Sequence, residues 1–201
     1  MNDKCSVLRQ RKITHVVSVV SAEKRSLPPF ILGHYYHRVD DREAAAEDMA
    51  AGFRGIVGFI EEARQAGGVV YVHCGAGISR APTAAAAYLI WKLRLSAAAA
   101  ISLLRRSRPC ARPNVGFVNV LKAWEVTCCA LPLNTLPADF KFDAQSASKS
   151  MMNTAIVAPE PEIPSKSGVE THLLRLAVDP AATIVKPWPS PNGRRVDEVV
   201  D

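Results

Sequence analysis

A cysteine and an arginine, six positions apart, enclose a short glycine-containing loop near the middle of the chain. Cys74 follows an apolar run at residues 69–72, and Arg80 precedes a long apolar segment with helical character. A loop that joins a buried strand to a helix N-terminus points its backbone N–H groups at a bound anion, and glycines let that backbone approach the ligand closely. The pattern therefore predicts a phosphate-binding loop, with contacts from Gly75, Ala76, Gly77, Ile78, Ser79 and Arg80.

The same loop predicts a reactive thiol. Inward-facing N–H groups, the dipole of the following helix and the charge of Arg80 would all favour the thiolate of Cys74, which is the nucleophilic form. Arg80 can bind two phosphoryl oxygens at once, which a lysine does not match. His73 would act from behind, by positioning the cysteine backbone through a hydrogen bond. The structural alternative makes Cys74 a small buried hydrophobic residue at a strand end, but the complete pattern from strand to helix is much rarer by chance.

Transfer of a phosphoryl group to a cysteine also needs a proton donor for the leaving oxygen, supplied from another loop. Asp40 and Asp41 follow the second predicted strand and precede a long predicted helix. Ligands of α/β sheets bind at the carboxyl ends of the strands, where these two carboxylates are expected. We therefore predict that one of them is the general acid. The alternative is that both are acidic residues that favour the start of the helix.

Short apolar or β-branched runs alternate with segments of helical periodicity, which predicts an α/β sheet with helices on its faces. Ser96 is the expected N-cap of one of these helices, and Gly67 and Gly68 follow the expected end of another. Strands are predicted at residues 13–20, 35–39 and 69–72, and helices at residues 43–66, 81–93, 97–107 and 115–130.

Composition divides the chain near residue 130. Residues 131–201 hold 9 of the 14 prolines, and the net charge changes from +8 in residues 1–130 to −2 beyond them. We expect a catalytic domain at 1–130 and a largely disordered tail with prolines and serines at 131–201, in which only residues 169–178 suggest a short helix.

The composition, with 48% hydrophobic and 22% charged residues, excludes collagen, coiled-coil and disulfide-scaffold proteins. Lys92 and Arg94 interrupt the longest apolar zone, so a membrane span is not expected, and the N-terminus shows no apolar signal-peptide region. The five cysteines have no zinc-site spacing and are interpreted as free thiols in a reducing compartment. That compartment is expected to be the cytoplasm, with the nucleus as the alternative.

Taken together, these motifs resemble the cysteine-based protein tyrosine phosphatases, and among them the small, atypical dual-specificity phosphatases. The resemblance covers residues 10–126, and its landmarks occur in the order of that family. They are Ile13-Thr14-His15-Val16-Val17, Tyr36-His37-Arg38-Val39-Asp40-Asp41, Phe59-Ile60, Val72-His73-Cys74-Gly75-Ala76-Gly77-Ile78-Ser79-Arg80-Ala81-Pro82-Thr83, Ala87-Tyr88-Leu89, Arg108-Pro109 and Pro113-Asn114-Val115-Gly116-Phe117.

The resemblance implies a central mixed, mostly parallel sheet flanked by helices, and hydrolysis in two steps through a phosphocysteine without a metal or cofactor. It implies that Cys74 is the nucleophile, that Arg80 binds the phosphate and that Asn114 supports the loop. The general acid of the family matches Asp41. Asp40 is the second choice, because the segment that follows is about two residues longer than is usual in the family.

This sequence departs from the family pattern in two places, and each departure leads to an expectation. The residue after Arg80 is usually a serine or threonine that helps to discharge the phosphocysteine, but here it is Ala81, which predicts slow turnover. The neighbouring Ser79 is a candidate to replace that hydroxyl. Only twelve residues precede Ile13, where relatives carry a strand and a helix, so we expect either a domain trimmed at one sheet edge or a shortened gene model.

The expected partners are phosphorylated proteins, through phosphotyrosine and phosphoserine or phosphothreonine. The loop lacks the lysines that relatives acting on inositol lipids carry. The alternative function is a phosphoprotein-binding module with weak or no turnover. A nucleic-acid partner is not expected, because the basic residues lack interleaved aromatics or a reader motif, and the sequence leaves the oligomeric state open.

A cluster of arginines either contacts an acidic partner or complements a helix end; its members are Arg105, Arg106, Arg108 and Arg112.

Overall fold

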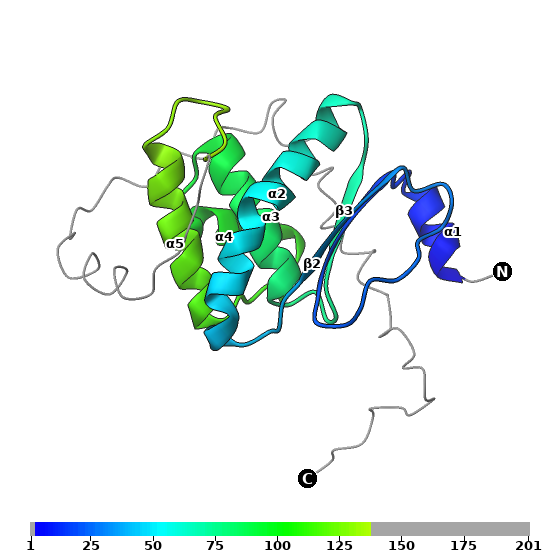
Figure 1. Ribbon diagram of the computed structural model, residues 1–201, viewed down its shortest axis with the longest axis horizontal. Helices are drawn as coiled ribbons and strands as arrows, with labels where there is room; N and C mark the ends of the chain where they lie inside the picture. Colours follow the sequence, from blue (N-terminus) through cyan, green and yellow to red (C-terminus); the bar gives the residue numbers. More distant parts are fainter. Residues whose placement is uncertain (1–2, 138–201) are drawn as a thin grey trace, which may run out of the picture.

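The computed structural model describes residues 3–137 as one arrangement of short parallel strands and helices (Figure 1). The predicted tail helix at 169–178 lies outside these residues. In chain order the elements are α1 (Asp3–Gln10), β1 (His15–Val20), β2 (Gly33–Arg38), the 3-10 helix η1 (Glu43–Ala45), α2 (Ala46–Gln65), β3 (Val70–His73), α3 (Arg80–Leu93), α4 (Ala97–Ser107) and α5 (Val115–Cys129).

The three described strands form a parallel sheet in the order β2-β1-β3. The central strand, β1, is rich in valine because both of its faces are covered, as is usual for strands inside parallel sheets. In the register, Ser18 of β1 lies beside Tyr36 of β2 and His73 of β3. The carboxyl ends of β2 and β3 therefore meet at one edge of the sheet, and this brings the segment after Arg38 close to the loop after His73.

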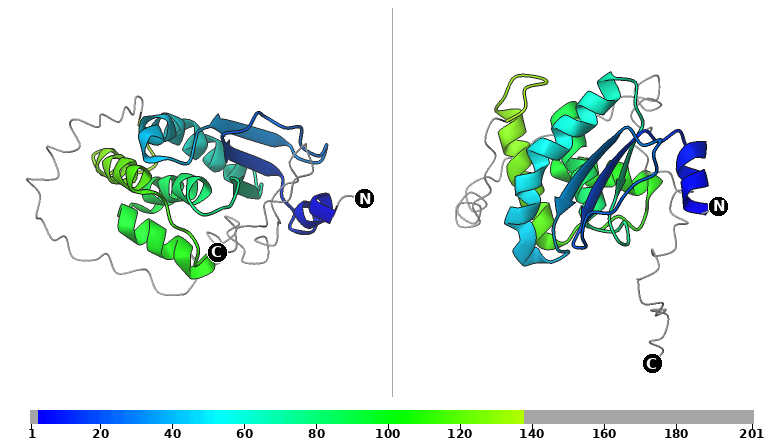
Figure 2. Two further views of the ribbon diagram at one scale, coloured as in Figure 1. Left: turned by 90° about the horizontal axis from the view of Figure 1, so that it is seen from below. Right: turned by 45° about the vertical axis from the view of Figure 1, so that its right-hand side comes forward.

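The helices α2 to α5 gather on one side of the sheet, and α1 lies apart from them beyond the strands (Figures 1 and 2). α3 is at the centre of this group and packs against α2, α4 and α5. Its residues 81–91 are all buried, which explains why the sequence is apolar around the whole helix. Among the described helices, none alone is long and apolar enough to span a membrane; only α3 and α4 together, which bend by 119°, would pass on length and composition.

The predicted order of strands and helices is confirmed, with several differences at the boundaries. The helix expected from residue 43 begins as η1 before it continues as α2, and α1 was not predicted at all. Residues 131–137 pack on the helices although they were assigned to the tail: Trp91 Nε1 donates a hydrogen bond to the carbonyl of Thr135, and Leu136 packs against the core. Ser96 caps α4 as expected, by accepting a hydrogen bond from the N–H of Ala99.

A close approach of η1 to the first turn of α5 holds two parts of the site together. A Cβ atom placed on Gly116 would lie 2.6 Å from the carbonyl oxygen of Glu43 and 2.8 Å from its Cα. The Cβ of an alanine at Gly58, which is also helical, would have only Leu136 within 4 Å, at 3.5 Å. Only glycine therefore lets η1, which follows Asp41, rest on α5, which follows Asn114.

We expect Gly116→Ala to destabilise the protein by about 1–3 kcal/mol, because backbone atoms must move to admit the methyl group. The matched control, Gly58→Ala, should leave stability unchanged or raise it by up to about 1 kcal/mol through helix propensity. Urea unfolding followed by circular dichroism measures both changes. Equal stability of the two variants would show that the contact between η1 and α5 is not tight.

Candidate active site

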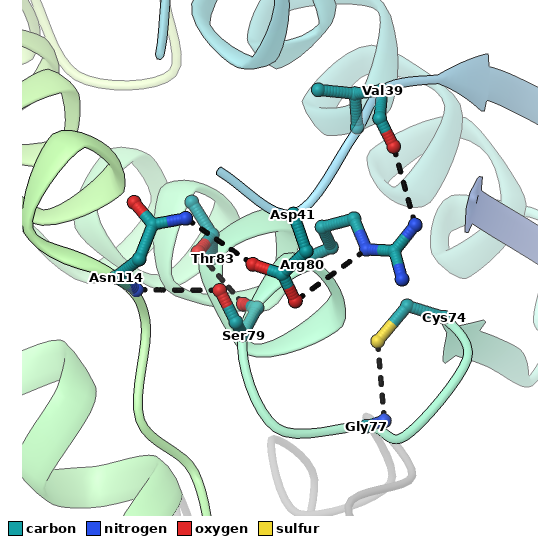
Figure 3. A network of polar contacts seen from close by, with 8 residues as sticks. All are labelled: Val39, Asp41, Cys74, Gly77, Ser79, Arg80, Thr83 and Asn114. Atoms are coloured by element: carbon teal, nitrogen blue, oxygen red, sulfur yellow. Dashed lines mark hydrogen bonds and ion pairs between the residues drawn. The ribbon is translucent and has the colours of Figure 1, made fainter. Parts of the chain in front are cut away.

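The loop between β3 and α3 wraps around the side chain of Cys74. The Sγ atom of Cys74 accepts a hydrogen bond from the backbone N–H of Gly77, with a separation of 3.2 Å (Figure 3). Gly77 has a φ of +66°, a left-handed conformation that favours glycine. One backbone N–H of the loop thus points at the sulfur, and α3 begins at Arg80, directly after the loop.

Arg80 lies across this loop with its guanidinium on the same side as Cys74 (Figure 3). Its Nη1 donates a hydrogen bond of 3.2 Å to the carbonyl of Val39, at the end of β2. Its Nε lies 3.7 Å from Oδ2 of Asp41, which is an ion pair but too long for a hydrogen bond. Among the residues that the structure describes, none accepts a hydrogen bond from this buried Nε. The site therefore presents a buried cationic donor that an additional anion can satisfy.

The structure distinguishes the two candidate acids. Asp41 faces the loop: its Oδ2 pairs with Arg80, and its Oδ1 accepts a hydrogen bond of 3.2 Å from Nδ2 of Asn114. Asp40 instead pairs with Arg42 at 3.4 Å, and both of those side chains are more than half exposed. No side chain caps η1, so neither aspartate serves as the helix cap. Asp41 is thus the carboxylate that the fold brings to Cys74 and Arg80.

Asn114 links Asp41 to the loop, in the supporting position that the resemblance implied. Its Oδ1 accepts from the N–H of Phe117 and caps α5, while its backbone N–H donates to Oγ of Ser79 at 3.3 Å. Ser79 is buried, and its hydroxyl contacts Asn114 (Figure 3). Ala81 is also buried, in the first turn of α3. The hydroxyl of Ser79 is therefore engaged in support of the loop from the α5 side.

His73 lies behind Cys74, where it was predicted. Its Nε2 is 2.7 Å from Oγ of Ser18, and its ring makes a hydrogen bond with the backbone of Cys74. Burial lowers the pKa of His73, the bond to the Cys74 backbone opposes that effect, and the neighbouring His34 lowers the pKa further. The imidazole is therefore neutral at physiological pH, and it holds the start of the loop as a hydrogen-bonding group.

Arg108 supports the outside of the loop, a role that the sequence did not reveal. Its Nε donates to the carbonyl of Gly77 at 2.6 Å, and its Nη2 donates to the carbonyl of Ala76 at 2.9 Å. These bonds turn the two carbonyls outward, so their peptide N–H groups are free to point inward. The sequence marked Arg108 as one of four clustered arginines and, with Pro109, as a landmark of the family resemblance, but neither observation indicated a contact with the loop.

The remaining residues of the predicted phosphate-binding loop lie at the surface or bond to neighbouring segments. Gly75 and Ala76 are exposed, and Ile78 is 42% exposed, so the mouth of the loop is open to a substrate. The carbonyl of Ile78 accepts a hydrogen bond from the N–H of Arg112. All five cysteines of the chain, Cys74 included, are free thiols.

Comparison with known proteins identifies relatives of this site and fold. The family model "Dual specificity phosphatase, catalytic domain" matches residues 2–127. The chain is 36% identical over 120 residues to dual specificity protein phosphatase 1 of Arabidopsis thaliana, covering 60% of this chain and 59% of that protein. It is 33% identical over 114 residues to a probable rhodanese domain-containing dual specificity protein phosphatase of Dictyostelium discoideum, covering 57% of this chain and 23% of that protein. The chain thus spans less than two thirds of these curated relatives.

A solved structure agrees with the sequence matches. The crystal structure of human DUSP28 superposes with a TM-score of 0.56 at 30% sequence identity, covering 60% of this chain and 80% of that chain. The similarity therefore extends from the sequence motifs to the arrangement of the sheet and helices.

We expect Arg108→Ala to weaken the binding of inorganic vanadate about tenfold or more, because two charge-assisted hydrogen bonds to the loop carbonyls are lost. The matched control is Arg112→Ala, which removes the same charge nearby but no side-chain bond to Ala76 or Gly77. Its effect should stay within about twofold. Titration calorimetry with vanadate measures both, and equal losses would mean that charge alone, rather than loop support, determines oxyanion affinity.

Proposed function

Because this chain belongs to the dual specificity phosphatase family, within the cysteine-based protein tyrosine phosphatase superfamily, we propose that it hydrolyses phosphate monoesters on protein side chains. The substrates are phosphotyrosine and phosphoserine or phosphothreonine, and the reaction passes through a phosphocysteine. One observation carries the proposal: the buried Nε of Arg80 has no hydrogen-bond acceptor among the described residues, and the guanidinium lies on the same side of the loop as Cys74 (Figure 3). A phosphoryl group bound over Cys74 supplies that acceptor.

In the first step the thiolate of Cys74 attacks phosphorus, and the bond from phosphorus to the leaving oxygen breaks. Arg80 and the inward N–H groups of the loop hold the charge of the transferring phosphoryl group. Asp41 gives its proton to the leaving oxygen. Its side chain is 36% exposed and that of Arg80 is 12% exposed, so the acid stays in contact with solvent while the phosphate clamp is buried.

In the second step a water molecule attacks the phosphocysteine. Asp41, now a carboxylate, takes a proton from this water, the bond between sulfur and phosphorus breaks, and inorganic phosphate leaves. Ala81 offers no hydroxyl to assist the departing sulfur, and among the described contacts no hydrogen bond joins Ser79, whose Oγ accepts from the N–H of Asn114, to Sγ of Cys74. The second step is therefore the slow one.

The alternative, a phosphoprotein-binding module, needs the loop and Arg80 but has no use for an acid. The position of Asp41, held against Arg80 by Asn114, favours the enzyme. An experiment on the acid consequently separates the two functions.

Asp41→Asn should lower kcat/KM about a hundredfold or more on phenyl phosphate, since a general acid contributes at least that factor. The loss should be smaller on p-nitrophenyl phosphate, whose leaving group needs no proton. Asp40→Asn should stay within about threefold on both substrates, and Cys74→Ser should abolish hydrolysis. Steady-state assays on the purified chain measure these rates. Equal losses on the two substrates would assign Asp41 a structural role, and vanadate binding without any hydrolysis by the wild type would favour the binding module.

Ala81→Ser should speed phosphocysteine breakdown by about tenfold, the worth of one hydrogen bond to a charged group. Stopped-flow assays with p-nitrophenyl phosphate should show a burst followed by slow turnover in the wild type. In the variant the steady rate should rise and the burst should shrink. An unchanged steady rate after the burst would contradict the assignment of the slow step to the missing hydroxyl.

A further inference from the structure

Three polar side chains form a continuous hydrogen-bonded row across the sheet, behind the phosphate-binding loop. Oγ of Ser18, on the central strand β1, lies 2.7 Å from Nε2 of His73 on β3 and 2.9 Å from Nε2 of His34 on β2. Ser18 is only 5% exposed. Its neighbours in β1, Val17 and Val19, belong to the core under the helices, so the row occupies the opposite face of the sheet.

The chemistry of the three groups gives this row one direction. The bond between the His73 ring and the Cys74 backbone raises the pKa of His73, which means that the ring donates its proton there. Since Nε2 faces Ser18, the donor is Nδ1, and in the neutral ring Nε2 is an acceptor. The hydroxyl of Ser18 must then donate to His73, and its remaining capacity is to accept. His34 consequently donates its Nε2–H to Ser18.

We propose that Ser18 and His34 are positioning residues for the nucleophile: the row from His34 through Ser18 fixes the tautomer and orientation of His73, and His73 in turn fixes the backbone of Cys74. This role rests on the proposed phosphatase function for its effect on rate. The row itself is a property of the folded protein and is measured without substrate.

The position of His34 supports a role beyond satisfying buried groups. Ser18 and His73 already satisfy each other, and His34 is partly exposed, so water could serve its nitrogen. Yet its ring is directed to Ser18. Burial, and to a smaller extent the charge of Lys24, lower the pKa of His34. In either protonation state its Nε2 can carry the hydrogen that Ser18 accepts, so the row persists when this outer histidine titrates.

Protonation of His73 has the opposite consequence. A charged ring would present an N–H to Ser18, whose hydroxyl would then face two donors and lose its own acceptor. The groups that face His73 are the hydroxyl of Ser18, the ring of Tyr71 stacked at 5.3 Å, the backbone of Cys74 and the nearby His34. None of these is a carboxylate that would favour the charged ring. The hydrogen bonds of the row are therefore satisfied when His73 is neutral and carries its proton on Nδ1.

The first test is the tautomer of His73, read from long-range proton–nitrogen NMR spectra of the ligand-free full chain. The wild type should show a single form, protonated on Nδ1. Ser18→Ala should populate the second tautomer, and Ser18→Thr, which restores the hydroxyl, should return the single form. A wild-type ring protonated on Nε2, or a ring that Ser18→Ala leaves unchanged, would overturn the proposal whether or not the chain is a phosphatase.

The second test is a double-mutant cycle on aryl phosphate hydrolysis. Ser18→Ala should lower kcat/KM, which reports phosphocysteine formation, about fivefold, the worth of one neutral hydrogen bond. It should leave vanadate affinity within twofold because Arg80 and the loop donors remain. His34→Phe should lower kcat/KM two- to threefold, while His34→Gln, which keeps a donor, should recover most of it. In the Ser18→Ala background His34→Phe should have no further effect, since His34 acts through Ser18.

The matched control for this cycle is Tyr36→Phe, which removes one hydrogen bond of 2.6 Å from the same strand, to the carbonyl of Ala22, without touching the row. It should leave kcat/KM and the His73 tautomer unchanged. Additive losses for Ser18 and His34, or a loss in Tyr36→Phe equal to that in His34→Phe, would overturn the proposal. If the wild type proves inactive, the NMR measurement alone decides it.

Discussion

The need to accommodate the buried guanidinium of Arg80 organises the whole site. A buried cation is costly unless partners compensate it, and the fold supplies only a partial set: the carbonyl of Val39 and, at ion-pair distance, Asp41. These partners come from the end of β2, whereas Arg80 itself follows the loop after β3, so one side chain ties the two strand ends together. The unfilled donor at Nε leaves room for one more anion, held against Cys74. In the proposed function, the same interaction that stabilises the arrangement also provides the affinity for phosphate.

Supporting contacts reach the loop from both sides, so the backbone donors do not depend on the loop's own stiffness. Arg108 holds the carbonyls of Ala76 and Gly77 from the α4 side, and Asn114 holds Ser79 from the start of α5. His73 holds Cys74 from the sheet. A cradle of N–H groups stabilises a developing charge only when it is already oriented before the substrate arrives. These contacts hold the loop backbone in place, although its two glycines are what allow that backbone to approach a ligand closely.

Much of the fold and part of the site could be predicted from the sequence, and the division has a physical cause. Cys74, Gly77 and Arg80 lie close together in the chain, so their spacing alone predicts the phosphate-binding loop. The N-cap at Ser96 is likewise predicted from local residues. The choice of Asp41 over Asp40 depends on which carboxylate turns toward Arg80 and Asn114, which lie far along the chain. The hydrogen bonds from Arg108 to the loop carbonyls also join residues that lie far apart in the chain, and the cluster of four arginines does not indicate which of them makes these bonds. The helix α1 was missed because its eight residues show only a short apolar pattern. Residues 131–137 were missed because their packing depends on distant residues such as Trp91.

In the proposed mechanism, formation and breakdown of the phosphocysteine make different demands on this loop. The backbone donors and Arg80 hold the charge on the phosphoryl oxygens in both steps, so their contribution to the two barriers is similar. The sulfur is different: it loses its charge when the intermediate forms and regains it when the intermediate breaks down. Only a donor directed at sulfur favours breakdown specifically, and among the described contacts the N–H of Gly77 is the one that reaches it. Because Ala81 has no hydroxyl and no described hydrogen bond joins Ser79 to the sulfur, the proposed mechanism implies that the intermediate forms more readily than it breaks down.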